Sequence, residues 1–181
     1  IESVLLIGYG VFGYTDFNES EMNPYGLEYL GSEFGETFNY FDGTYKFVIG
    51  MGDTKIRTKV YNYIVNKGGS FINVIHPDAS ISKNVVLGKG VFVAKNASIN
   101  PFCSIGDNVI INTSSTIDHE CIIECGVHVA PNATLLGNVR VGKNTFIGAN
   151  SVVKQGVIIG DNVVIGAGSV VLNDVANNAV L

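Results

Sequence analysis

Two of the three histidines in the chain lie close together, and one of them has acidic neighbours. His119 is flanked by Asp118 and Glu120, and His128 follows nine residues later. A carboxylate beside an imidazole fixes its tautomer and raises its basicity, which are the properties of a general base. An isolated histidine is more often a hydrogen-bonded surface residue, so the flanking carboxylates are what favour chemistry at His119. Acyl transfer to an amine or hydroxyl requires such a base, with donors for the tetrahedral oxyanion.

The residues around these histidines repeat with a period of six. Every sixth residue from Ile75 to Val171 is Ile, Leu or Val, and the residue four positions later is small or β-branched. Gly or Asn recurs beside them, and both tolerate tight or left-handed turns. A period of six favours short strands joined by sharp corners. Three such faces make a coil of eighteen residues, with coils about 4.8 Å apart. We therefore predict a parallel β-helix from residue 75 to about residue 176.

The β-helix determines where the two histidines can act. Nine residues are half a coil, so His119 and His128 should lie on different faces, outside the core columns. If three rods pack around a threefold axis, His128 of one subunit can meet His119 of its neighbour. We therefore expect a homotrimer with active sites between subunits, and an inactive monomer.

The first 74 residues differ from the repeat. Ser3–Gly10 and Lys46–Gly50 are apolar and predict buried strands, and Thr54–Val65 has helical spacing. We therefore predict two domains: a small Rossmann-like α/β nucleotide-binding domain over 1–74 and the β-helix over 75–181. A GxGxxG match begins at Gly8, but the helix that this motif needs does not fit after Gly10. Either this domain is degenerate or residues are missing from the chain after Gly10. We favour the second alternative, and we expect a similar truncation after Leu181.

Composition excludes several classes of function. The net charge is −5 without a basic run, which argues against a nucleic-acid partner. No apolar run approaches the roughly 18 residues of a membrane span. Three cysteines without paired His spacing predict no metal site and reduced thiols, and hence a cytoplasmic protein.

The stretch 111–121 (INTSSTIDHEC), followed by His128 and the hexads, closely resembles the NeuD/PglD-type sugar acetyltransferases. These bacterial enzymes acetylate sialic acids or nucleotide-linked 4-amino sugars. The resemblance is strong after Ile75 and weak before it. It implies that the β-helix is left-handed and that acetyl-CoA is the cosubstrate.

The resemblance also implies roles for individual residues. His119 looks like the general base, polarised by Glu120. His128 looks like the residue of the adjacent subunit that contacts the thioester region of acetyl-CoA, and Gly137 matches a backbone amide that binds the acetyl oxygen. Asn112 matches a polar residue near the acceptor, although it also fits a corner-turn Asn.

Further roles fall in the first domain. Gly8 and Gly10 resemble the phosphate-side turn, Asp16 the acid on the base or ribose side, and Gly50, Met51 and Gly52 the loop beneath the sugar. The family's Gly-His pair after the first glycines is missing, and a Gly-Met-Gly-Asp loop replaces its Gly-Asn loop.

These observations favour an acetyl-CoA-dependent N-acetyltransferase acting on a nucleotide-activated 4-amino-6-deoxy sugar, UDP-linked, in bacterial surface glycan synthesis. A sialic acid O-acetyltransferase is the nearest alternative, because the same base serves either nucleophile. A metal-dependent β-helix enzyme of the carbonic anhydrase type needs three His ligands, which the nine-residue spacing does not supply. A non-catalytic β-helix scaffold would retain the fold without turnover.

Overall fold

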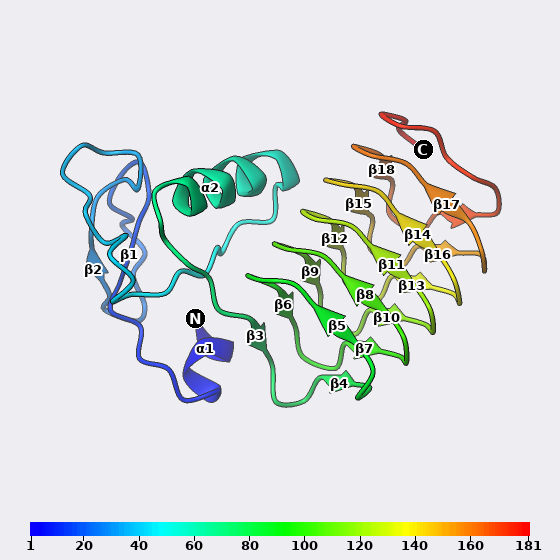
Figure 1. The fold of residues 1–181 in the computed structure, drawn as a ribbon, viewed down its shortest axis with the longest axis horizontal. Coiled ribbons are helices and arrows are strands. Elements are labelled where there is room, and N and C mark those ends of the chain that lie inside the picture. Colours follow the sequence, from blue (N-terminus) through cyan, green and yellow to red (C-terminus); the bar gives the residue numbers. More distant parts are fainter.

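A computed structural model describes all residues, 1–181, and most of them form a triangular β-helix. Seventeen strands of two residues each follow one another from β3 to β19, and three faces are wound in turn (Figure 1). The first face contains β3 (Val74–Ile75), β6 (Phe92–Val93), β9 (Ile110–Ile111), β12 (His128–Val129), β15 (Phe146–Ile147) and β18 (Val164–Ile165). The second contains β4 (Ser80–Ile81), β7 (Ser98–Ile99), β10 (Thr116–Ile117), β13 (Thr134–Leu135), β16 (Val152–Val153) and β19 (Val170–Val171). The third contains β5 (Val86–Leu87), β8 (Ser104–Ile105), β11 (Ile122–Ile123), β14 (Arg140–Val141) and β17 (Ile158–Ile159).

The register between neighbouring strands confirms the predicted coil. All pairs are parallel, and the partners are eighteen residues apart, as in Ile117 with Leu135 and Ile123 with Val141. The second residue of each strand points inward and is buried along most of the rod. The predicted small-residue columns are buried as well, for example at Cys121 and Ser115. The core is therefore a stack of aliphatic ladders that no single coil could form alone.

The corners are built from residues in the left-handed region of backbone space. Eight of the eleven non-glycine residues with positive φ are Asn, as the Asn-rich corners predicted. The glycine after an inward aliphatic serves another purpose. A Cβ on Gly106 would lie 2.7 Å from the backbone nitrogen of Cys125 on the next coil, and Gly106 has no positive φ. This glycine therefore permits the close approach of two coils and not an unusual backbone turn.

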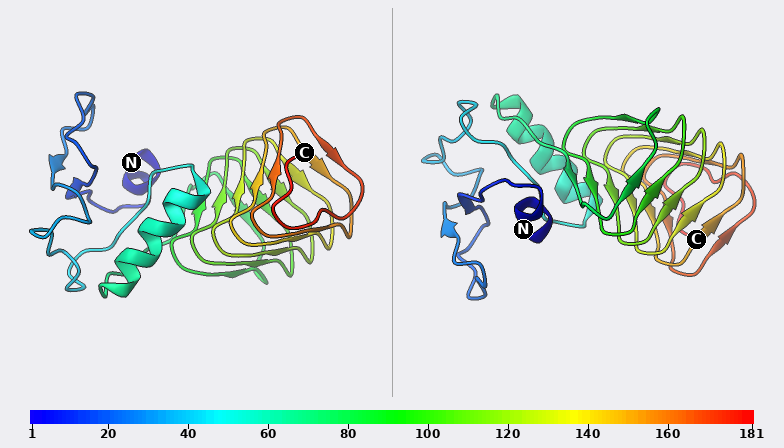
Figure 2. Two further views of the ribbon diagram at one scale, coloured as in Figure 1. Left: turned by 90° about the horizontal axis from the view of Figure 1, so that it is seen from above. Right: turned by 90° about the horizontal axis from the view of Figure 1, so that it is seen from below.

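Helix α2 (Thr54–Asn66) lies beside the first coils, as two further views show (Figure 2). Asp53 caps it by accepting a hydrogen bond from the backbone of Ile56 at 2.8 Å. Its buried face contains Arg57, Val60, Tyr61 and Ile64. The helix confirms the prediction for residues 54–65.

The Rossmann-like domain predicted for residues 1–74 is wrong. The apolar start of the chain forms the short helix α1 (Glu2–Leu6) in place of a strand. Only β1 (Gly13–Tyr14) and β2 (Glu28–Tyr29) pair there, and residues 46–50 contribute one isolated bridge, Phe47 with Phe71. A nucleotide-binding α/β unit requires buried parallel strands joined through crossover helices. Leu5 and Leu6 are instead about half exposed, so they do not lie in a sheet core.

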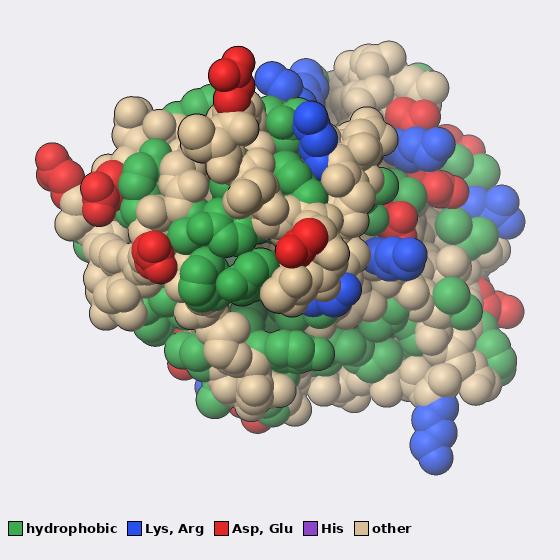
Figure 3. All heavy atoms as spheres, turned by 60° about the vertical axis from the view of Figure 1, so that its left-hand side comes forward, with side chains coloured by type: hydrophobic (Ala, Val, Ile, Leu, Met, Phe, Trp, Pro, Cys, Tyr) green, Lys and Arg blue, Asp and Glu red, His purple; other side chains and the backbone are tan.

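The division at residue 74 and the missing residues after Gly10 stay predictions. The face formed by the N-terminal segment has apolar side chains at its centre and charged side chains scattered around them (Figure 3). Phe17 and Tyr25 are among the exposed aromatic residues of the N-terminal segment. Neither helix is long and apolar enough to cross a membrane.

The ladders give a matched test of the fold. Val153 is fully buried, whereas the preceding Val152 points outward and is 38% exposed. Val153→Ala should lower the free energy of unfolding by about 2 kcal/mol, because it removes two packed methyl groups and leaves a cavity. Val152→Ala removes the same atoms from a solvated site and should cost less than about 0.5 kcal/mol. Urea unfolding measures both, and equal losses would contradict the inward and outward assignment.

Candidate functional site

His119 and Glu120 form a pair at the corner between β10 and β11. The Nδ1 atom of His119 lies 3.1 Å from Oε2 of Glu120, and the imidazole is about half exposed. A carboxylate can only accept a hydrogen bond, so Nδ1 carries the proton and Nε2 keeps its lone pair. Glu120 reaches this position with a backbone φ of +60°, a conformation that few residues other than Asn and Gly adopt. The corner therefore holds the imidazole in the tautomer that a general base needs.

Asp118 fixes the backbone of the same corner. Its Oδ1 accepts hydrogen bonds from Nδ2 of Asn100 at 2.9 Å and from the backbone of His119 at 2.8 Å. The hydrogen bond from the Asn100 amide is the largest cause that holds the pKa of Asp118 below its ordinary value, and the one from the His119 backbone is the next. Its other oxygen lies 3.9 Å from Nε2 of His119, beyond hydrogen-bond distance. Asp118 thus orients the corner and leaves Nε2 available.

Gly137 lies one coil further along, directly against the imidazole. A Cβ at this position would lie 2.5 Å from both Nε2 and Cε1 of His119, so only glycine leaves room for the ring. The backbone N–H of Gly137 donates to no backbone carbonyl and lies near the Asp118 carboxylate. The structure therefore brings His119, Glu120 and Gly137 together, because residues one coil apart share a corner.

His128 lies on the first face, in a different environment. Its Nδ1 is 3.1 Å from the carbonyl oxygen of Gly52, and its Nε2 is 3.2 Å from Nδ2 of Asn112. A carbonyl accepts and an amide nitrogen donates, so the ring is neutral with its proton on Nδ1. The ring of Phe146 packs edge-on against it, with centroids 5.1 Å apart.

A pocket of about 330 Å³ opens beside His128. Its lining comes from the start of the chain, from residues 48–52 and from the first face. It includes Gly50, Met51, Gly52, Asn112 and His128, five residues that the sequence assigned to substrate or cofactor binding. The N-terminal residues Ile1–Val4 and the outward side chains of Phe92 and Ile110 also line it, and no motif pointed to them.

Arg57 is the functional residue that the sequence reasoning missed. Its guanidinium is buried and donates to the carbonyl oxygens of Gly52 at 2.9 Å, Gly126 at 2.6 Å and Asn108 at 3.2 Å. Burial lowers its pKa to about 10, which Asp53 partly opposes, so the charge remains at neutral pH. The available signal was a charged residue in helical register with Val60 and Ile64. Arg57 joins α2 to the coils and fixes the carbonyl that orients His128.

Three predicted residues lie outside both sites. Gly8 and Gly10 lie in the exposed turn after α1, and Asp16 is exposed and accepts from the backbone of Phe17 at 2.7 Å. None of them lines the pocket beside His128. Their predicted roles toward a nucleotide stay predictions. No group of three or more His, Cys, Asp or Glu side chains is placed to hold a metal ion.

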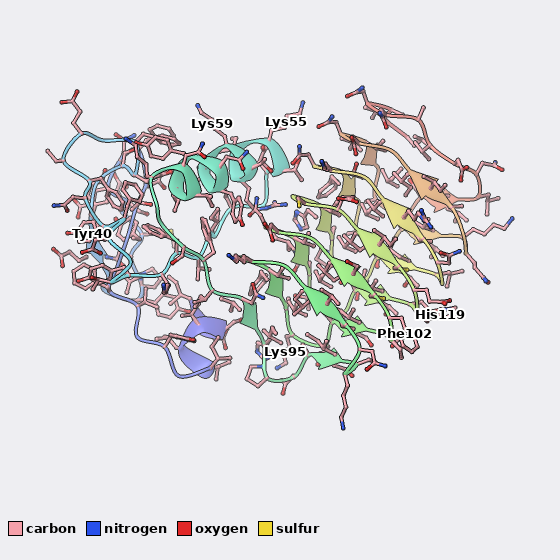
Figure 4. The ribbon with its side chains drawn as sticks, viewed as in Figure 1. Tyr40, Lys55, Lys59, Lys95, Phe102 and His119 are labelled. Carbon is pink, nitrogen blue, oxygen red and sulfur yellow. The ribbon has the colours of Figure 1, made fainter.

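Within one chain, His119 and the pocket remain separate. His119 belongs to the corner between the second and third faces, and His128 belongs to the first face. Figure 4 shows His119 on the side of the rod away from the N-terminal segment. This separation is the one that the nine-residue spacing predicted.

Burial lowers the pKa of His128 below its ordinary value of 6.5, and the nearby positive charge of Arg57 acts in the same direction. The unfolded chain therefore binds a proton that the folded chain does not, as the pH falls through this range. The contribution of His128 to the free energy of unfolding should have its full value above about pH 6.5 and decrease in more acidic solution. His128→Gln should flatten this part of the pH dependence in urea unfolding from about pH 8 to about pH 5. Parallel curves for the two proteins would contradict the neutral, buried state of His128.

Comparisons with known proteins agree with this geometry. A family model of bacterial transferase hexapeptides matches residues 84–119 and 120–155, and a model of the hexapeptide repeat of succinyl-transferase matches residues 138–173. None of the curated proteins compared with the chain matches it.

Solved structures cover nearly the whole chain. A variant of perosamine N-acetyltransferase from Caulobacter crescentus, in complex with CoA and GDP-perosamine, is 31% identical with a TM-score of 0.91, over 99% of this chain and 85% of that one. The acetyltransferase domain of PglB from Neisseria gonorrhoeae is 26% identical with a TM-score of 0.89, over 99% and 87% of the two chains. WeeI from Acinetobacter baumannii, at 22% identity and a TM-score of 0.82 over 93% and 81%, supports the fold alone. The chain belongs to the acetyl-CoA-dependent sugar acetyltransferases built on a left-handed β-helix of hexapeptide repeats.

Proposed function

We propose that the protein transfers the acetyl group of acetyl-CoA to the amine of a nucleotide-linked 4-amino-6-deoxy sugar, with His119 as the general base. The observation that carries this proposal is the pairing of His119 with Glu120 at 3.1 Å, which leaves Nε2 unprotonated above Gly137. The Caulobacter and Neisseria neighbours are both acetyltransferases, and the first was solved with CoA and a nucleotide-linked amino sugar.

In the proposed reaction, His119, Gly137 and Glu120 each have one role. The amine nitrogen of the sugar attacks the thioester carbon, and Nε2 of His119 accepts the proton that the nitrogen loses. The backbone N–H of Gly137 is proposed to donate to the oxyanion that forms on the acetyl group. The C–S bond then breaks, the CoA thiolate takes up the proton, and an amide bond remains. Glu120 stabilises the imidazolium during this step.

The pocket beside His128 is proposed to complete the site across a subunit boundary. It is separate from His119 within one chain, and its lining combines a glycine loop with the polar groups of Asn112 and His128. In a homotrimer, this pocket of one subunit would face the His119 corner of the next. The pocket then receives the thioester end of the pantetheine arm, and the loop of residues 50–52 lies beneath the sugar.

The nucleotide and the setting are parts of the same proposal. A UDP-linked sugar is the sequence-based expectation, and the Caulobacter enzyme was solved with a GDP-linked one. The setting is the cytoplasm of a bacterium that makes surface glycans, where acetyl-CoA and activated sugars are both available. The three thiols without disulfide bonds are compatible with that compartment.

The experiment is release of free CoA thiol from acetyl-CoA with UDP-, GDP- and dTDP-linked 4-amino sugars and with free sialic acid. Turnover with an amino sugar should fall by about 10²- to 10⁴-fold in His119→Ala and by about tenfold in Glu120→Gln, because the base and then its orienting partner are lost. Gln155→Ala is the matched control, since Gln155 is exposed and lies two coils further along the corner of His119. Turnover with sialic acid alone would overturn N-acetylation, and unchanged activity of His119→Ala would overturn the base.

A further inference from the structure

The corner of His119 contains an aromatic residue in a backbone conformation that aromatic residues rarely adopt. Phe102 has a φ of +64°. Among the corner residues with positive φ, only Phe102, Ser114 and Glu120 are neither Asn nor Gly. A bulky residue in the left-handed region is strained, and such strain persists where the residue serves another purpose. Glu120 already has such a purpose, because it pairs with His119.

Phe102 gains little from burial at this position. Its side chain is 64% exposed, among the most exposed of the large apolar residues in the β-helix. An exposed ring on a strained backbone stabilises neither the core nor the corner. The purpose of this side chain must therefore lie in what it contacts outside its own chain.

The position of Phe102 relates it directly to the catalytic corner. Phe102 precedes Glu120 by eighteen residues, so the two stack on successive coils. The backbone of Glu120 donates to the carbonyl of Pro101 at 3.0 Å, and the thiol of Cys103 donates to the carbonyl of Asp118 at 2.9 Å. Figure 4 shows Phe102 and His119 projecting from neighbouring coils on the same side of the rod.

The two sides of His119 along the rod are therefore unlike. On the side of the next coil, the imidazole lies against the backbone of Gly137, whose N–H lies near the Asp118 carboxylate. On the side of the preceding coil, Pro101 lies eighteen residues before His119 and Phe102 lies beside it, and both are apolar and exposed. A tetrahedral oxyanion requires the polar side. The apolar side suits a group that presents C–H bonds.

We propose that Phe102 forms the aromatic wall of the acceptor site and packs against the apolar face of the sugar ring whose amine reacts at His119. A sugar whose amine reaches His119 must lie against the exposed surface around this corner, and the ring of Phe102 is exposed on the neighbouring coil of the same surface. An aromatic side chain supplies a large contact area and loses little conformational freedom on binding. This inference rests on the proposed function, because it takes His119 as the base.

The test is Phe102→Asn, which removes the ring and supplies the residue that the other corners use. Its melting temperature should stay the same or rise by about 2–4 °C, because the backbone strain is relieved. The KM for the amino sugar should rise by about tenfold, because the lost contact exists both in the substrate complex and in the transition state. The KM for acetyl-CoA and kcat should change less than about twofold. Phe102→Tyr should restore the KM.

Ser114→Asn is the matched control, because it relieves the same kind of strain at another corner without removing a ring. It should match Phe102→Asn in thermal stability and leave the KM for the sugar unchanged. An unchanged KM in Phe102→Asn would overturn the inference. So would a lower melting temperature, or dissociation of the oligomer in sedimentation, because the ring would then serve the fold or a subunit contact. Activity that survives in His119→Ala tests the proposed function separately, since that result does not depend on Phe102.

Discussion

The whole structure depends on the stacking of eighteen-residue coils without an insertion. Each two-residue strand has too few hydrogen bonds and too little buried surface to exist alone, so every coil is ordered by the coils on either side. The uninterrupted register also sets the chemistry, because it places residues 18 apart on the same corner. His119 meets Gly137 and Glu120 lies above Phe102 for this reason alone. A slip of one residue would exchange the inward and outward side chains along the rest of the rod.

Arg57 is the second constraint, and it links the N-terminal segment to the coils. Its guanidinium satisfies carbonyl groups at the corner between the third and first faces and also holds the carbonyl of Gly52. The same Gly52 oxygen accepts the proton on Nδ1 of His128. One buried cation therefore positions both the glycine loop and the tautomer of the histidine beside the pocket. Removing it would leave several carbonyl groups buried without a donor.

The rod and its corner residues could be predicted because the information is periodic. The aliphatic positions define the coil, and the spacing of His119 and Gly137 is one full coil, which is enough to place them on one corner. The N-terminal segment could not be predicted in the same way. Its apolar run at Ser3–Gly10 fits a strand or a helix equally well, and the GxGxxG match at Gly8 depends on a following helix that does not form. Arg57 was missed because a charged residue on a helix is normally solvated, and only its tertiary contacts show that it is buried.

The partners of Arg57 also determine how firmly the two parts of the chain are held together. The guanidinium is bound by neutral carbonyl dipoles and not by carboxylates, and it is shielded from solvent. Dissolved ions weaken attractions between exposed charges, but they do not enter this contact. Carbonyl oxygens do not titrate, so mild acid leaves the partners unchanged. The contact between Arg57 and the coils should therefore depend little on the salt content of the surroundings.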